Sequence, residues 1–234
     1  MKEIYFVTIP RSGHHITIDI IKEIAHQNSL PFSYCEFYNH QGCTHCPCDE
    51  KDHPFKIYKS HDFELSPECI IPEWKHPLHI HSDHIYIIMY RRDPIRQFES
   101  WYRHYVDTYP DKSHIRKFPI FLRANIEHYS NFIQKWLYHS KDYANIHSFA
   151  YEDFLSDPRK VIQSILALLY PENHSSIKGV DDIIDTFDVR YKHNISVEQY
   201  DTIRSLLAHY PESWYTFPEV NILPSQNMDK TSTV

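Results

Sequence analysis

Apolar residues along the chain alternate between runs of strand length and repeats with the period of a helix. The first run, Ile4 to Ile9, is rich in β-branched and aromatic residues and predicts a buried strand. Isoleucines at positions 16, 20, 21 and 24 then follow a helical spacing, which predicts a helix that ends near residues 26–28. A short polar turn that contains Arg11 and Gly13 joins the two.

The turn between this strand and this helix has the properties of an anion site. The first N–H groups of a helix have no partners within the helix, and they lie at the positive end of its dipole. Arg11 adds a full positive charge, and Gly13 is one of only 3 glycines, which indicates a close approach of backbone and ligand. The alternative is a buried strand-to-helix turn that binds nothing.

Further strand-like runs and helix-like repeats continue along the chain. The predicted strands are Pro31 to Tyr38, Phe55 to Tyr58, His84 to Tyr90 and Ile146 to Ala150. One helix is predicted to begin at Pro94. The other predicted helices cover Pro119 to His139, Pro158 to Leu169, Ser175 to Phe187 and Ser196 to His209. Because strands alternate with helices throughout, we predict an α/β fold: a P-loop-like three-layer arrangement with a central, mainly parallel β-sheet flanked by helices.

These elements predict a single domain over residues 1–210. A chain of 234 residues with 41% hydrophobic residues can bury a core of that size, and no internal repeat or domain boundary interrupts it. Residues 64–82 contain three prolines and no clear period, which indicates a loop. Residues 211–234 are predicted to form a loose C-terminal tail.

The formal net charge of −7 does not favour binding to nucleic acid or to acidic membranes. An anion must therefore be held by a local pocket of positive charge. No apolar segment approaches ~18 residues, and the N-terminus enters a strand directly instead of a signal peptide. We expect a soluble, cytoplasmic protein without a transmembrane segment, and the sequence leaves its oligomeric state open.

Residues 39–53 form a loop rich in cysteine and histidine. Cys43, Cys46, Cys48 and His53 have spacings short enough for a zinc site, although the second ligand pair of a strong zinc signature is missing. A disulfide is a second interpretation if the protein meets an oxidising compartment, and cysteines in an ordinary surface loop are the third. None of the chemistry inferred below depends on this loop.

Polar side chains also follow two of the later strands. Lys59 and His61 come after Phe55 to Tyr58, and ligands bind at the carboxyl ends of strands in an open α/β sheet. His61 is therefore a candidate general base and Lys59 a candidate clamp, with a solvated loop as the alternative. Arg92 at a strand end and Ser100 on the next helix can both reach one anion, whereas a surface ion pair is the alternative for Arg92.

Four short motifs resemble, in the same order, those of the cytosolic-type sulfotransferases. Pro10-Arg11-Ser12-Gly13-His14-His15 is similar to their 5′-phosphosulfate loop, Pro-Lys-Ser-Gly-Thr-Thr, and Lys59-Ser60-His61 is similar to the segment that carries their catalytic histidine. Arg92-Asp93-Pro94 with Ser100 resembles their 3′-phosphate motif, and Tyr151-Glu152-Asp153 resembles the segment whose tyrosine lies near the adenine. The resemblance extends over residues 4–170.

This resemblance implies the transfer of a sulfuryl group from 3′-phosphoadenosine 5′-phosphosulfate (PAPS) to a hydroxyl acceptor. Arg11 would stabilise the leaving oxygen, His61 would take the acceptor's proton and Lys59 would lie against the transferring group, with no metal required. A carbohydrate, a lipid-linked glycan and a small phenol all fit as acceptors. The residues implied to contact the donor are Arg11, Ser12, Gly13, His14, His15, Arg92, Ser100 and Tyr151.

The chain also departs from the pattern of the sulfotransferases. Arg11 replaces a lysine, His14 and His15 replace two threonines, and Ile16 stands where an adenine-stacking tryptophan is common. The resemblance therefore does not account for adenine stacking. A late Arg-Lys-Gly motif that completes the 3′-phosphate site is absent, and the residues that could substitute for it are Arg190 and Lys192, in the basic loop 188–194.

Two other functional classes agree with parts of the pattern. A P-loop kinase or nucleotide hydrolase would share the fold, but it needs a Gly-x-x-x-x-Gly-Lys-Ser/Thr loop, and residues 8–16 contain one glycine and no lysine. A non-catalytic metal-binding or adaptor protein could use the loop from Cys43 to Cys48. That reading leaves Arg11, His61 and Arg92 unexplained.

Overall fold

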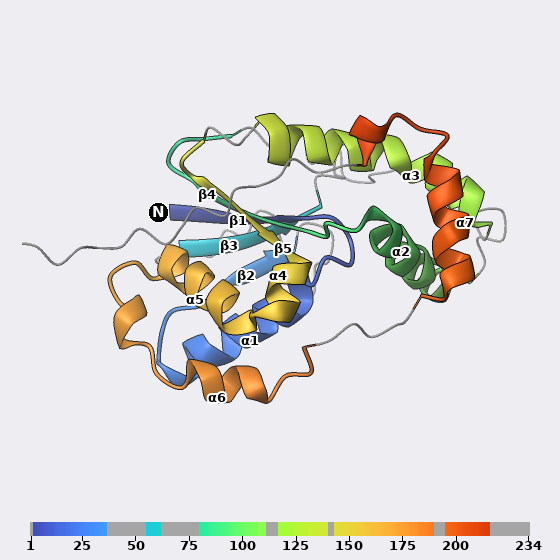
Figure 1. The fold of residues 1–234 in the computed structure, drawn as a ribbon. Helices are drawn as coiled ribbons and strands as arrows, with labels where there is room; N and C mark the ends of the chain where they lie inside the picture. The colour runs from blue at the N-terminus through green and yellow to red at the C-terminus, as the bar shows by residue number, and fades with distance from the viewer. Residues whose placement is uncertain are drawn as a thin grey trace, which may run out of the picture.

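The computed structural model describes residues 2–36, 55–61, 80–110, 117–139, 143–189 and 195–215. Within these ranges the strands form a 5-stranded sheet in the order β2-β3-β1-β4-β5, and each neighbouring pair is parallel. The predicted α/β fold with a central parallel sheet is confirmed (Figure 1). The strands are β1 (Lys2–Thr8), β2 (Tyr34–Glu36), β3 (Phe55–Ser60), β4 (Ile85–Tyr90) and β5 (Ile146–Ala150).

Alternate residues of the central strands fill two separate cores, one on each face of the sheet. Ile4 and Phe6 of β1 face the core that includes α1 (His14–Gln27), α5 (Pro158–Leu169) and α6 (Val180–Asp185). Val7 packs on the opposite face, where the core includes α2 (Pro94–Thr108), α3 (Phe118–Ile133) and α7 (Val197–Leu207). Helices therefore cover both faces of the sheet and give three layers (Figure 1).

Two predicted helices differ from those in the structure. The helix predicted over Pro119 to His139 is α-helical only to Ile133 and continues as a π-helical segment, η2 (Gln134–His139), which buries Trp136. The helix predicted over Ser175 to Phe187 is broken. Gly179, with a φ of 69°, separates the 3₁₀ turn η3 (His174–Ser176) from α6, because a left-handed residue cannot continue a right-handed helix.

The chain between β5 and α5 also contains a short helix that the apolar pattern did not predict, α4 (Tyr151–Ser156). It ends at Asp157, whose side chain accepts a hydrogen bond from the Lys160 N–H and caps α5. Beyond α7, the 3₁₀ turn η4 (Glu212–Trp214) contacts α3, and the Gln134 amide donates to the Ser213 carbonyl (3.1 Å). Residues 211–215 of the predicted tail are thus packed against the domain.

Several predictions fall outside the described residues. They concern the Cys/His loop 39–53 with Cys43, Cys46, Cys48 and His53, the basic residues Arg190 and Lys192, and the tail beyond residue 215. In the part of the chain that the structure describes, no helix has both the length and the apolar character that a membrane crossing requires.

Candidate active site

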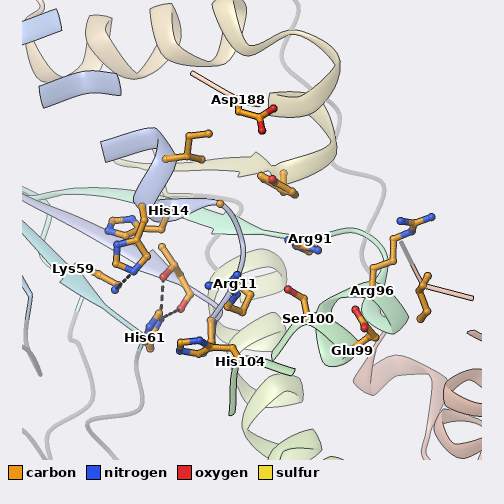
Figure 2. A pocket seen from close by; sticks show the side chains of 17 residues that line it. Arg11, His14, Lys59, His61, Arg91, Arg96, Glu99, Ser100, His104 and Asp188 are labelled. Carbon is orange, nitrogen blue, oxygen red and sulfur yellow. Dashed lines mark hydrogen bonds between the residues drawn. The ribbon is translucent and has the colours of Figure 1, made fainter. Parts of the chain in front are cut away.

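A cavity of about 190 Å³ lies at the carboxyl ends of the strands. Its walls come from the end of β1 and the loop after it, from the end of β3 and the residue after it, from the residue that follows β4, and from one face of α2 (Figure 2). Of the predicted site residues, the structure brings eight together around this cavity: Arg11, Gly13, His14, His15, Lys59, His61, Ser100 and Tyr151.

Backbone and side-chain hydrogen bonds hold the loop between β1 and α1 in shape. Both the N–H and the hydroxyl of Ser12 donate to the Ile9 carbonyl, at 3.2 Å and 2.8 Å, so Ser12 is buried in the loop and does not line the cavity. The Gln97 amide on α2 donates to the Pro10 carbonyl and ties the loop to that helix. Within the described ranges no side chain caps the start of α1, which leaves its first N–H groups at the loop for a ligand.

Two residues of this loop have a left-handed backbone. Gly13 has a φ of 86°, and an added Cβ would lie 2.3 Å from Cδ2 of the Tyr151 ring. A glycine is required there for both reasons. Arg11 has a φ of 71°, a strained conformation for a residue with a Cβ. The Nε of its half-buried side chain is buried without a hydrogen-bond partner in the part of the chain that the structure describes. Strain and an unpaired buried donor in one residue indicate a binding role.

His61 faces β1 because of the strand register. Ser60 of β3 pairs with Val7 of β1. The next residues along the two strands, His61 and Thr8, are therefore neighbours at the carboxyl ends of these strands. The His61 Nδ1 lies 2.7 Å from the Thr8 carbonyl oxygen and 3.0 Å from its hydroxyl. A carbonyl only accepts, so Nδ1 carries the proton and donates to it, and the basic lone pair of the neutral ring is on Nε2.

The electrostatic surroundings keep His61 neutral. Burial lowers its pKa well below the ordinary value of 6.5, and the nearby Lys59 cation lowers it further, while the hydrogen bond to Thr8 opposes both. Lys59 itself is buried, and its ammonium donates to Nε2 of His15 at 3.2 Å. The cavity therefore holds a neutral imidazole directly beside a buried cation.

The two arginines that follow β4 point to different surroundings in the structure. Tyr90 pairs with Ala150, so Arg91 and Tyr151 are the next neighbours, and the Arg91 guanidinium carbon lies 4.5 Å from the centre of the Tyr151 ring. Arg91 is 8% exposed and lines the cavity. Arg92 does not line it, because its side chain pairs with Asp153 and its N–H donates to the Glu152 carboxylate (3.0 Å).

One face of α2 supplies the far wall of the cavity. Arg96, Ser100 and His104 follow each other at helical spacing and line it together, with Glu99 beside them. Asp93 caps this helix by accepting hydrogen bonds from the N–H groups of Ile95 (2.9 Å) and Arg96 (3.2 Å). In Figure 2, Arg96 and Ser100 lie at one side of the cavity and Lys59 and His61 at the other.

The cavity is positively charged although the chain as a whole is negative. Among its described lining residues, Arg11, Lys59, Arg91 and Arg96 are cationic, and Glu99 and Asp188 are anionic. The Glu99 carboxylate is neutralised further by an ion pair with Arg103. Partial burial and the charge of Arg11 also lower the pKa of His104. An anionic ligand is the partner that this arrangement favours.

Sequence reasoning overlooked three cationic or imidazole residues of this site. Arg96 and His104 could have been found from Ser100, because they lie four residues before and after it on one helix face. Arg91 could have been found from the alternation of β4, since Ile85, Ile87 and Met89 face the same core as Tyr151.

A parallel α/β sheet with a basic cavity at its carboxyl ends and a tight strand-to-helix loop is typical of proteins that bind phosphate-like groups. The family comparison makes this class specific, because the profile of the sulfotransferase domain matches residues 2–209. The chain therefore belongs to the sulfotransferase domain family, whose members are transferases that move a sulfuryl group. No curated protein matches the sequence.

In the described ranges, no three histidine, cysteine or acidic side chains are placed to hold a metal ion. The Cys/His loop, with Cys43, Cys46, Cys48 and His53, lies outside those ranges.

Proposed function

We propose that this protein transfers a sulfuryl group from PAPS to a hydroxyl group of a small-molecule acceptor, for which a carbohydrate is one candidate. The observation that carries the proposal is the local positive charge. A chain with a net charge of −7 gathers Arg11, Lys59 and Arg91 around one cavity, and it orients His61 beside them. Charged hydrogen bonds from such groups are the means by which proteins hold multiply charged phosphates.

The residues present fit the donor at its 5′ end. Among the described residues, the Arg11 Nε and the His14 Nδ1 are buried nitrogens without hydrogen-bond partners, and both belong to residues that line the cavity at the start of α1. The phosphosulfate group would be held there by Arg11, the N–H groups that begin α1, and the side chains of His14 and His15. Ser12 would hold the loop in shape through the Ile9 carbonyl instead of contacting the donor.

For the 3′-phosphate we propose Arg91 and Ser100, with Arg91 in the role that the sequence motif assigned to Arg92. Both line the cavity, whereas Arg92 is held by Asp153. Tyr151 would contact the nucleoside and also hold Arg91 in place through its ring. Arg190 and Lys192 remain candidates from the sequence, and their described neighbours Asp188 and Ile195 line the cavity.

The chemistry that these groups support is an in-line transfer. The acceptor oxygen forms a bond to sulfur, the bond between sulfur and the phosphate oxygen breaks, and adenosine 3′,5′-bisphosphate (PAP) leaves with that electron pair. His61 Nε2 takes the acceptor's proton, because its Nδ1 already carries one. Arg11 neutralises the charge that develops on the leaving oxygen, and Lys59 lies against the transferring group.

A donor-dependent screen tests this function. The protein is incubated with PAPS and panels of sugars, phenols and amines, and the products are read by mass spectrometry together with released PAP. We expect at least one hydroxyl compound to gain one sulfuryl group for each PAP released, and we expect ATP to support no transfer. Phosphorylation with ATP and no sulfated product with PAPS would overturn the proposal.

A further inference from the structure

His14, the first residue of α1, is held in one orientation by aromatic neighbours. Its ring lies 5.4 Å from the centre of the Phe6 ring and stacks on the Tyr34 ring at 5.8 Å. Its Nε2 is 2.8 Å from the Tyr34 hydroxyl, which is contributed by the edge strand β2. The side chain is 4% exposed and lines the cavity. His14 is therefore positioned from outside its own loop.

The other ring nitrogen of His14 has no hydrogen-bond partner among the described residues. Nδ1 is buried and makes no hydrogen bond in the described part of the chain, and the Arg11 Nε close by in sequence has the same property. Buried polar atoms in folded proteins nearly always have partners, so such exceptions call for an explanation. Two of them in one loop, at the uncapped start of a 14-residue helix, point to a ligand with several acceptor oxygens.

The hydrogen bond to Tyr34 decides what Nδ1 can do. Burial and the neighbouring Lys59 lower the pKa of His14 well below 6.5, so the ring is neutral at pH 7 and carries one proton. If the Tyr34 hydroxyl donates to Nε2, that proton is on Nδ1, which becomes a donor. If Nε2 donates instead, Nδ1 carries a lone pair, which an anion would repel.

We propose that Tyr34 holds His14 in the tautomer protonated at Nδ1, and that this N–H donates to an oxygen of the donor's 5′-phosphosulfate group. His14 then contacts the ligand, and Tyr34 is a positioning residue that acts through it. The inference rests on the proposed function, because it takes PAPS as the occupant of the cavity.

The tautomer can be read without any catalytic assay. Nitrogen-15 NMR of histidine-labelled protein, with His14→Asn used to assign the His14 signals, should show Nδ1 protonated and Nε2 unprotonated. Addition of PAP should shift the Nδ1 resonance, and Tyr34→Phe should produce a mixture of tautomers. A ring protonated at Nε2, or a His14 resonance that PAP leaves unchanged, would overturn the inference.

Binding measurements with PAP form the second test, because PAP retains the 5′-phosphate. His14→Ala should weaken PAP about 10- to 100-fold, as expected for the loss of a hydrogen bond to a charged group. The affinity of His14→Asn for PAP should stay within about threefold of that of the unmodified protein, since the asparagine amide nitrogen takes the place of Nδ1. Adenosine 3′-monophosphate, which lacks the 5′-phosphate, should bind equally to all three proteins.

The two proposals fail in different ways. Unmodified protein that does not bind PAP contradicts the donor assignment itself. Unmodified protein that binds PAP, with His14→Ala binding it equally well, contradicts only the role of His14 and Tyr34.

Discussion

His61 takes its orientation from a backbone carbonyl. Its Nδ1 donates to the Thr8 carbonyl at 2.7 Å, which directs the basic Nε2 away from β1. A carboxylate partner would raise the pKa of the ring, whereas burial and the adjacent Lys59 lower it. His61 is therefore neutral at neutral pH, as the proposed general base must be, although its lowered pKa also makes it a weaker base.

Replacing His61 should separate catalysis from folding. We expect His61→Ala to retain PAP binding and to lose about 10²- to 10⁴-fold in turnover, the usual effect of a positioned base. In the unmodified enzyme the acidic limb of turnover should lie below pH 6.5, because the lowered pKa keeps His61 neutral to more acidic pH. His174→Ala, an exposed histidine outside the cavity, is the control. Turnover of His61→Ala within about threefold of the parent would exclude a base.

Arg91 and Arg92 provide a matched pair for the 3′-phosphate. We expect Arg91→Ala to weaken PAP by about 1.5 to 3 kcal/mol, the range for a charged hydrogen bond. Arg92→Ala should weaken PAP binding by less than about 1 kcal/mol, because Arg92 pairs with Asp153 and does not line the cavity. Calorimetric titrations with PAP measure both. A larger loss for Arg92→Ala than for Arg91→Ala would restore the assignment made from the sequence motif.

At the scale of elements, the β1 to α1 loop and the β5 to α4 junction depend on each other. The Tyr151 ring at the start of α4 contacts Gly13 on one element and the Arg91 guanidinium on another. The contact joins the proposed 5′ and 3′ ends of the donor site through one side chain. A change in the loop should therefore be felt at Arg91.

Gly13→Ala should destabilise the protein more than a comparable change at another left-handed glycine. Gly179 also has a positive φ, but its nearest neighbour would be 4.0 Å from an added Cβ. Gly179→Ala should therefore cost only the backbone strain, about 1 to 2 kcal/mol. Gly13→Ala adds to this strain the overlap of the new Cβ with the Tyr151 ring. Combining Gly13→Ala with Tyr151→Ala should remove the destabilisation that this overlap causes. Equal unfolding free energies for the two glycine variants in denaturant titrations would show that the overlap has no effect.

The elements themselves could be predicted well from the sequence, because buried parallel strands are continuous apolar runs. His84 to Tyr90 was predicted as a strand and Ile85–Tyr90 is β4. The pattern could not show that the helix after Pro119 becomes π-helical at Gln134, since both helix types bury one apolar face. The pattern also missed the break at Gly179, because the left-handed backbone of this residue interrupts the helix and hydrophobic spacing does not reveal backbone conformation.

The site could be predicted only in part, for a reason that the two arginines illustrate. The motif placed the phosphate contact at Arg92, but the register of β4 with β5 brings Arg91 to the Tyr151 side. Strand register depends on contacts between segments far apart in the chain, which a single sequence does not display. The geometry of the loop proposed to bind the anion was easier to predict because all of its parts lie within six consecutive residues, 9–14.

For the whole molecule, the depressed pKa of a buried histidine links stability to pH. His14 is 4% exposed and neutral, and its pKa lies well below the 6.5 of the unfolded chain. Below pH 6.5 the unfolded chain binds more protons than the native protein, so stability must fall as pH falls and is complete above 6.5.

On acidification below pH 6.5, we expect His14 alone to lower the unfolding free energy by up to about 1.4 kcal/mol per pH unit. The unfolding free energy of His14→Asn, which cannot titrate at this position, should depend less steeply on pH when it is measured by urea titrations between about pH 5.5 and 7.5. An identical slope in the two proteins would mean that His14 titrates alike in the folded and unfolded states.

The distribution of charge over the molecule leads to the last prediction. A protein with a net charge of −7 repels nucleotides in general, so only a ligand that engages both ends of the basic cavity should bind well. PAP carries a phosphate for the Arg11 loop and another for Arg91 and Ser100, whereas 5′-AMP carries only the first. In a thermal-shift titration, PAP should therefore raise the melting temperature clearly more than 5′-AMP at the same concentration. Equal shifts with the two nucleotides would contradict a 3′-phosphate site and, with it, the assignment of PAPS as the donor.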